Sequence, residues 1–415
     1  MKKGWIWVLA GFGIVAALVL FAVNNGKKTE DAPSVFYVPN AGEGTISVID
    51  SVKAKTIDTI SLGTKQASHG IAISPDGSIL YSGTGFEGKT LVAINTKTKK
   101  IMNKIAFDEG VHGIDVSSDG KYLYVSLMPG LGKGEGTVSI LNTKDMKQVA
   151  AVNTGGGPAH IAVTPDGSQV WVANVNGNTV AVIDTKTNKL IKTIAVGQVP
   201  NEVAVSADGK WAFVANVESN TVTVIDAKSM EVVKSIAARE APHGVTVSPD
   251  SAEVWVANNK SNDVSIIDIK TFNIKATIPT GAYANHVAFS QDGKWAYVTN
   301  RQSNDVVKID AKKKEVIAKI PVGTEPHEIT LEDFYGKPAS APAKTGGSIE
   351  DSVAANADGA QEVKTAKVGA VEIEAMRLVK NDKDLNQSID FQKYDVFQSV
   401  LTTHSGDLSS CRILK

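Results

Sequence analysis

Histidine is the side chain of this sequence whose placement most strongly suggests chemistry. The chain has seven histidines, and six of them recur at intervals of roughly 42 residues or a multiple of it. These six are His69, His112, His160, His243, His286 and His327. Neutral imidazoles bind copper, zinc and iron. A metal site would form if a repetitive fold brought them together.

The elements that must position these histidines belong to a sequence repeat. Clear copies span 158–197, 200–239 and 241–281. Each contains four short alternating runs, such as IAVT, VWVAN, TVAVID and LIKTIAV, separated by Pro-Asp-Gly, Ala-Asp-Gly or Ser-Asn turns. Such runs predict four strands per unit. Four-stranded units of this length are typical of β-propeller blades.

The two ends of the repeat region predict the number of blades. Six complete units begin near residues 69, 112, 159, 201, 243 and 285. Residues 35–62 contain strands two to four without a first strand, and HEITL at 327–331 is a first strand with nothing after it. We therefore predict an all-β, closed seven-bladed propeller over about 34–333, in which the two terminal pieces share one blade.

One aromatic position supports this register. It lies in the middle of each second strand, where we expect packing between neighbouring blades. Its members are Tyr37, Tyr81, Tyr124, Trp171, Phe213, Trp255 and Tyr297.

The second strands also carry a short signature: YVTN at 297–300, WVAN at 171–174 and 255–258, FVAN at 213–216 and YVPN at 37–40. With Ser/Thr-Pro-Asp-Gly turns before them and VSVID-like runs after them, these segments resemble the YVTN family of β-propeller repeats. The resemblance implies an extracytoplasmic or cell-surface propeller, and it implies no single chemistry.

The histidines occupy two adjacent positions at the start of the first strands. Position 1, eight residues before the turn glycine, holds His69, His112, Ala159, Asn201, His243, Asn285 and His327. Position 2 holds Gly70, Gly113, His160, Glu202, Gly244, His286 and Glu328. Because innermost strands surround a central channel, we predict that the six histidines, with Asn201, Glu202, Asn285 and Glu328, gather at one channel mouth.

Three interpretations of this histidine set remain open. In the structural one, each imidazole hydrogen-bonds loop carbonyls of the preceding blade. In the second, the six imidazoles hold a metal ion or a haem-type ligand. In the third, the mouth binds another small molecule. Nitrous oxide reductase and thiocyanate dehydrogenase are similar in using histidines at the mouth of a seven-bladed propeller to hold copper clusters. This likeness makes copper a candidate, and the sequence leaves the cofactor itself open.

Other features exclude or weaken further functions. Lysine plus arginine number 43 and aspartate plus glutamate 44, giving a net charge of −1, and no basic cluster carries interleaved aromatics, so nucleic acid is not an expected partner. The serines recur in one turn, which indicates turn chemistry. The glycine-rich segment 127–136 lacks the P-loop spacing and is predicted to be a loop insertion.

The segments outside the repeats predict location and tethering. Residues 4–23 contain no charge and are long enough to span a bilayer. We predict an uncleaved membrane anchor in residues 1–30, favoured over a removed signal peptide, with the propeller (31–335) facing the periplasm or the exterior. A flexible linker (336–366) and a small β-rich tail module (367–415) follow. Because some fifty residues make only a marginal domain, three alternatives stay open for the tail: it is incomplete, stabilised by a partner, or docked on the propeller. In the tail, His404 and Cys411 are interpreted as incidental rather than as copper ligands.

The sequence thus supports two functions. The first is a binding or scaffold module for protein partners, with the channel mouth as its site. The alternative is a periplasmic oxidoreductase or metal-binding protein that uses the histidine set. Whether the chain is an enzyme stays open.

Overall fold

The computed structural model describes residues 35–84, 88–130 and 132–331, together with the backbone of three strands between 351 and 378. The chain forms two compact units, residues 1–339 and 340–415.

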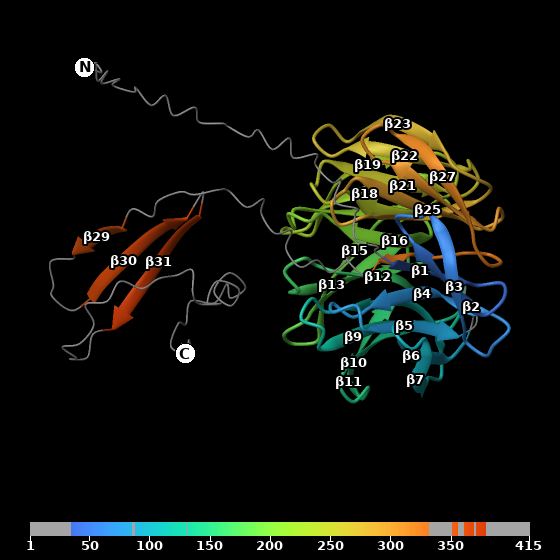
Figure 1. The fold of residues 1–415 in the computed structure, drawn as a ribbon, viewed down its shortest axis with the longest axis horizontal. Helices are drawn as coiled ribbons and strands as arrows, with labels where there is room; N and C mark the ends of the chain where they lie inside the picture. Colours follow the sequence, from blue (N-terminus) through green and yellow to red (C-terminus); the bar gives the residue numbers. More distant parts are fainter. Residues whose placement is uncertain are drawn as a thin grey trace, which may run out of the picture. The chain divides into compact units, whose positions relative to one another are not determined.

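The first unit contains seven four-stranded antiparallel sheets (Figure 1). The seventh blade has β28 (Thr330–Leu331), β1 (Val35–Asn40), β2 (Thr45–Asp50) and β3 (Lys55–Ser61). The first complete blade has β4 (Ala67–Ile73), β5 (Ile79–Thr84), β6 (Thr90–Asn95) and β7 (Lys100–Ala106), and the second has β8 (Gly110–Val116), β9 (Tyr122–Met128), β10 (Gly136–Asn142) and β11 (Gln148–Gly155). The third has β12 (Pro158–Val163), β13 (Gln169–Asn174), β14 (Thr179–Asp184) and β15 (Lys189–Ala195), and the fourth has β16 (Pro200–Val205), β17 (Trp211–Asn216), β18 (Thr221–Asp226) and β19 (Glu231–Ala237). The fifth has β20 (Pro242–Val247), β21 (Glu253–Asn258), β22 (Asp263–Asp268) and β23 (Asn273–Pro279), and the sixth has β24 (Ala284–Phe289), β25 (Trp295–Asn300), β26 (Asp305–Asp310) and β27 (Glu315–Pro321).

The terminal strands close the ring as predicted. In the seventh blade, β28 pairs with β1 through Phe36 with Leu331 and Tyr37 with Thr330. The His327 N–H also donates to the Pro39 carbonyl at 3.0 Å. The closing strand is shorter than the predicted 327–331, since only its last two residues form a ladder. The prediction of an all-β seven-bladed propeller is therefore confirmed.

The core lies between blades. The aromatic at the middle of each second strand is at most 2% exposed in all seven blades. The apolar clusters pair residues of neighbouring blades, as Trp171 and Val182 do with Val203 and Val214. This arrangement matches the expected packing role of the aromatic position and stabilises each blade against the next.

The serines and threonine of the first turn cap that turn, as the repeat pattern predicts. Each donates to the aspartate two residues later, for example Ser117 to Asp119 at 2.7 Å and Ser248 to Asp250 at 2.6 Å. The loop insertion of the second blade also lies where expected, between β9 and β10.

The second unit contains a three-stranded antiparallel sheet of β29 (Asp351–Ala355), β30 (Gln361–Val368) and β31 (Val371–Leu378). β31 lies within the tail predicted to be β-rich (367–415), whereas β29 and most of β30 lie within the segment predicted as linker (336–366). Alternation in QEVKTAKV and VEIEAMRL explains the pairing. Residues 379–415, with His404 and Cys411, lie outside the described residues.

No helix in the described part of the chain is long and apolar enough to cross a membrane. The predicted membrane anchor, residues 4–23, falls outside that part and stays a prediction.

Candidate metal centre

The site lies where the seven first strands meet. Successive first strands contact each other around the ring, as β4 does with β8 and β8 with β12. All six long first strands lose regular pairing with their second strand at position 1, for instance between Val111 and Ile114 in β8. A bulge of this kind frees neighbouring residues from strict alternation between the two sheet faces. Side chains of positions 1 and 2 can therefore reach the same space.

The structure brings all six predicted histidines together. The His69 and His327 rings stack with centroids 3.8 Å apart, and the His286 centroid lies 4.7 Å from that of His160 and 4.8 Å from that of His327. His112 lies 5.0 Å from His160, and His243 lies 4.9 Å from His286. We call these six residues the axial cluster. Five are at most 7% exposed, and His243 is half-buried.

Three members of the axial cluster form its tightest set. Ligand nitrogens of His160, His286 and His327 all lie within 4.8 Å of one another. A tetrahedral metal with nitrogen ligands at about 2.0–2.1 Å requires a nitrogen separation of about 3.4 Å, so modest ring movement would close the set. Of the other three, His69 and His112 are joined by a contact of 3.0 Å between His69 Nδ1 and His112 Nε2, and the His243 ring lies against that of His286.

Many of these nitrogens have no protein partner. Within the described residues, seven buried ring nitrogens of five cluster histidines lack a hydrogen bond, and two of these, Nδ1 of His160 and Nδ1 of His286, face carboxylates. The other five are His112 Nδ1, His160 Nε2, His243 Nδ1, His286 Nε2 and His327 Nδ1. A buried polar group without a partner costs about 1–3 kcal/mol, and a bound ion would remove that cost. The arrangement differs from loop capping, which would pair these nitrogens with carbonyls.

Two carboxylates from position 2 face the axial cluster. Glu328 Oε1 lies 3.6 Å from His160 Nδ1, and Glu202 Oε2 lies 3.2 Å from His286 Nδ1. Each glutamate also accepts a backbone N–H of the following blade, Glu202 from Val245 at 2.6 Å and Glu328 from Ile71 at 2.9 Å. Those backbone bonds hold each carboxylate in a position to orient an imidazole.

Burial and charge act differently on individual histidines. Burial, followed by the charges of neighbouring histidines, holds the pKa of His69, His112, His243 and His327 well below its ordinary value. Burial also disfavours the charged form of His160, but the hydrogen bond and charge of Glu328, with the charge of Glu202, outweigh it and raise the pKa of His160. The four neutral imidazoles are in the protonation state that binds metal.

Glycine at position 2 lets the first strands approach closely. A Cβ added to Gly113 would lie 2.4 Å from the Ala159 carbonyl oxygen, and one added to Gly70 would lie 2.2 Å from that of His112. Only glycine fits there. The staggering of the histidines between the two positions thus reflects packing of neighbouring backbones.

The two predicted asparagines lie at the same position but make different contacts. Asn285 Oδ1 accepts from Asn259 Nδ2 at 3.1 Å, while Asn201 Oδ1 has no hydrogen-bond partner among the described residues. Neither is within the histidine contacts described above. They complete position 1 without acting as ligands in this geometry.

Sequence reasoning missed Asp115. It stands on β8 and its Oδ2 accepts the Val163 N–H at 2.8 Å. Burial raises the pKa of Asp115 to about 7, and the charge of Glu328 adds to that effect against two backbone hydrogen bonds. Asp115 lies three residues after position 1, where the other blades carry small or apolar residues. This difference was the only signal for Asp115 in the sequence.

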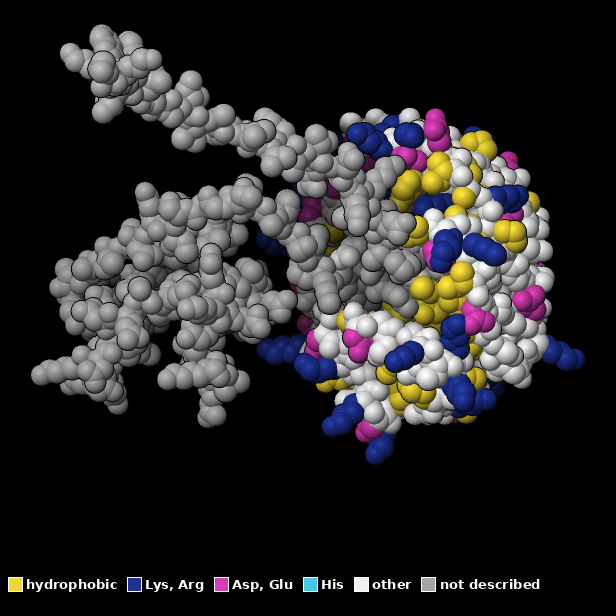
Figure 2. Space-filling view, in the orientation of Figure 1, with side chains coloured by type: hydrophobic (Ala, Val, Ile, Leu, Met, Phe, Trp, Pro, Cys, Tyr) yellow, Lys and Arg dark blue, Asp and Glu magenta, His cyan; other side chains and the backbone are white. Residues whose placement is uncertain are grey.

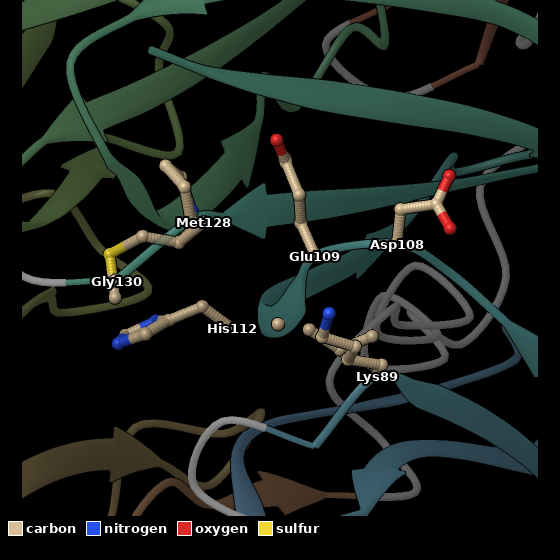
Figure 3. Close-up of a pocket in the computed structure, with 9 residues that line it drawn as sticks. Lys89, Asp108, Glu109, His112, Met128 and Gly130 are labelled. Atoms are coloured by element: carbon tan, nitrogen blue, oxygen red, sulfur yellow. The ribbon is translucent and has the colours of Figure 1, made fainter. Parts of the chain in front are cut away.

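A pocket of about 180 Å³ adjoins the axial cluster at His112 (Figure 3). Its wall is formed by the start of β8, the end of β9 and Lys89. Figure 3 shows the Met128 thioether and the His112 ring on one side, with Lys89 and Asp108 on the other. Sequence reasoning assigned the adjoining segment to a loop insertion only.

Two family models match parts of the chain. Residues 195–336 match the YNCE-like beta-propeller model, and residues 131–248 match the cytochrome D1 heme domain model. Together with the seven-bladed fold, the first match confirms the prediction of a YVTN-type propeller. Comparison with curated protein sequences gives no match.

Solved structures show the same fold at low identity. A functionally unknown protein from Desulfotomaculum acetoxidans is 17% identical with a TM-score of 0.62, and the alignment covers 72% of this chain and 98% of that one. Kuenenia stuttgartiensis hydrazine synthase is 21% identical with a TM-score of 0.57, covering 63% and 94%. A dihydro-heme d1 dehydrogenase in complex with DHE is 16% identical with a TM-score of 0.55, covering 71% and 74%. These likenesses show the fold alone.

Proposed function

We propose that this chain is a transition-metal-binding β-propeller whose ion is held by His160, His286 and His327. The observation that carries the proposal is the convergence of their ligand nitrogens within 4.8 Å. All three side chains are at most 2% exposed. The three imidazoles come from three different blades: His160 stands on β12, His286 stands on β24, and His327 precedes β28 and is fixed by its backbone hydrogen bond to Pro39.

The charges around the cluster suit a divalent ion. A dication buried among neutral imidazoles would be costly without counter-charge. Glu202 and Glu328 supply two carboxylates at the Nδ1 atoms of His286 and His160. Carboxylates in this position fix ring orientation and increase ligand basicity. The second ring nitrogens, His286 Nε2 and His160 Nε2, remain for the metal.

Copper is the first candidate ion. Imidazole suits copper, zinc and iron, and among divalent ions of the first row a given nitrogen site binds copper most tightly. His69, His112 and His243 add three more imidazoles in ring contact with the triad. Bound copper would supply redox chemistry at the propeller axis.

A haem-type ligand is the second candidate because residues 131–248 match the cytochrome D1 heme domain model. The imidazoles themselves oppose a macrocycle among them, since their centroids lie only 3.8–6.3 Å apart. Such a ligand would have to bind outside the cluster. The favoured ligand is a metal ion without a macrocycle.

The proposed location is the periplasm or the cell exterior, with residues 4–23 as the anchor. Protease applied to intact spheroplasts should digest the propeller. Protection until lysis would reverse the orientation. The predicted binding of protein partners remains a prediction that no contact among the described residues addresses.

The test is metal analysis of the purified full-length protein, combined with optical and electron paramagnetic spectra. We expect stoichiometric copper and no Soret band. His286→Ala and His160→Ala should lose the metal, whereas His404→Ala, which alters the one histidine outside the axial cluster, should retain it. Wild-type protein that takes up no metal after chelator treatment and reconstitution would refute the metal centre, and a Soret band would favour the haem-type ligand.

A further inference from the structure

The pocket beside His112 combines a soft ligand with an imidazole of the axial cluster. Its lining includes Met128 and His112, which face the same side of the pocket (Figure 3). Thioether sulfur selects copper(I), while imidazole accepts copper in both common oxidation states. Zinc(II) sites are built from cysteine, histidine and carboxylate ligands, without thioether. The pairing therefore favours copper(I) over zinc(II), which imidazole alone would also accept.

The charge of the pocket wall favours a cation. Asp108 and Glu109 provide two carboxylates, against one ammonium from Lys89. One carboxylate oxygen, Glu109 Oε2, is buried and has no hydrogen-bond partner among the described residues. An unpaired buried carboxylate oxygen is costly, and a nearby cation would lower that cost. A small anion would meet net repulsion there.

His112 connects the pocket to the axial cluster. It is 6% exposed, its Nδ1 has no hydrogen-bond partner in the described chain, and its Nε2 lies 3.0 Å from His69 Nδ1. His69 in turn stacks on His327 of the proposed triad. A continuous series of imidazoles thus leads from the pocket to the buried ligands.

We propose that this pocket is a copper(I) entry site, in which Met128 and His112 bind the ion before it passes to the axial cluster. The inference rests on the proposed metal centre and adds its ion specificity and its route of loading. Two ligands hold an ion loosely enough to release it, whereas the triad retains it. The transfer itself keeps the ion as copper(I), because no electron is exchanged between the entry ligands and the axial imidazoles. The divalent state of the proposed centre then requires loss of one electron to an oxidant such as dioxygen after loading, so the electron paramagnetic spectrum is recorded on air-oxidised protein.

The test measures loading rate and final stoichiometry separately. Full-length apoprotein is mixed anaerobically with copper(I) held by a chromophoric chelator, and loss of the chelator complex is followed by stopped-flow absorbance. Met128→Leu should slow copper(I) uptake by about tenfold or more while leaving the final stoichiometry unchanged. Zinc(II) uptake, measured in the same way, should keep its wild-type rate. Met128→Cys should restore copper(I) uptake because a thiolate is also a soft ligand.

Met102→Leu is the matched control, since Met102 is 53% exposed on the outer strand β7. It should load as the wild type does. An unchanged copper(I) rate in Met128→Leu would overturn the entry site, as would equal slowing of copper(I) and zinc(II), which indicates a change of pocket shape. In both cases a normal final copper stoichiometry would still support the axial metal centre. Wild-type protein without copper at equilibrium would refute the centre itself.

Discussion

At the scale of single residues, His160 and His286 differ from the other histidines because each faces a carboxylate across the channel. Glu328 comes from the seventh blade and His160 from the third, while Glu202 comes from the fourth blade and His286 from the sixth. Each carboxylate thus fixes the orientation of a ring that its own blade does not carry. Position 2 therefore supplies two of the three proposed ligands, His160 and His286, and both of the carboxylates that orient them.

Glu328→Gln and Glu202→Gln should each weaken metal binding by about 10- to 100-fold, because outer carboxylates raise the basicity of the ligand they contact. The amide retains an oxygen for the backbone N–H, so folding should be preserved. Competition against a chelator of known affinity measures the change. Glu325→Gln, which removes the pair with Arg301, is the control at the rim; an equal loss there would indicate a general electrostatic effect.

Asp115→Asn should stabilise the apoprotein above neutral pH. The pKa of Asp115 is about 7 when folded and about 3.9 when unfolded, so between these values the folded state binds the extra proton. The Asp115 contribution to stability therefore falls as pH rises from about 4 to 7. The stability difference between variant and wild type should grow by up to about 4 kcal/mol across that interval. Urea unfolding at pH 4.5, 6 and 8 measures it, and a difference independent of pH would contradict the assignment.

At the scale of elements, the bulged first strand is the device that creates the site. Regular alternation would direct positions 1 and 2 to opposite faces. The interrupted pairing, with glycine at position 2 in three blades, allows His112 and His160 to meet although they occupy different positions. The same interruption occurs in the fourth blade, which carries Asn201 and Glu202 and no histidine at these positions. It is therefore a feature of the repeat that the ligands use.

The closing strand should be required for cooperative folding. A chain ending at residue 321 lacks β28 and leaves β1 with an open edge, which is a template for aggregation. A chain ending at residue 339 retains β28 and should melt as one transition. Calorimetry and light scattering compare the two. A chain ending at 321 that stayed monomeric and melted at the same temperature would contradict the role of closure.

The repeat explains how much of the fold could be predicted. Strand number, blade number and closure follow from period and phase, and the turn serines and core aromatics mark the register. The site was predicted as a set of positions, yet the triad of His160, His286 and His327 was not singled out. Its identity depends on bulge geometry and on the approach of neighbouring backbones at Gly70 and Gly113, which no local pattern encodes. Asp115 and the Met128 pocket were missed because each occurs in one blade only.

At the scale of the propeller, the ring converts side chains distant in sequence into neighbours on one axis. The axial cluster joins residues from 69 to 327, so its formation depends on all blades being closed. The outer surface differs: the face drawn in Figure 2 carries basic and acidic side chains interspersed with apolar ones. That face therefore lacks a patch of one charge among its described residues, and the absence of a nucleic-acid partner stays a prediction from the sequence.

The propeller without metal should lose stability as pH falls below about 6.5. Four cluster histidines have pKa values held well below the ordinary value when folded, whereas in the unfolded chain they take up protons near pH 6.5. The unfolded state therefore binds more protons below that pH, and the stabilising contribution present above it is lost. Thermal melts of the chelator-treated full-length protein from pH 8 to 5 measure the effect.

His327→Gln should reduce the steepness of this loss of stability with falling pH, and His404→Gln, outside the cluster, should leave it unchanged. Added metal should steepen it, because protons compete with the ion for the same nitrogens. Equal pH profiles for wild type and His327→Gln would show that the buried imidazole is not the titrating group.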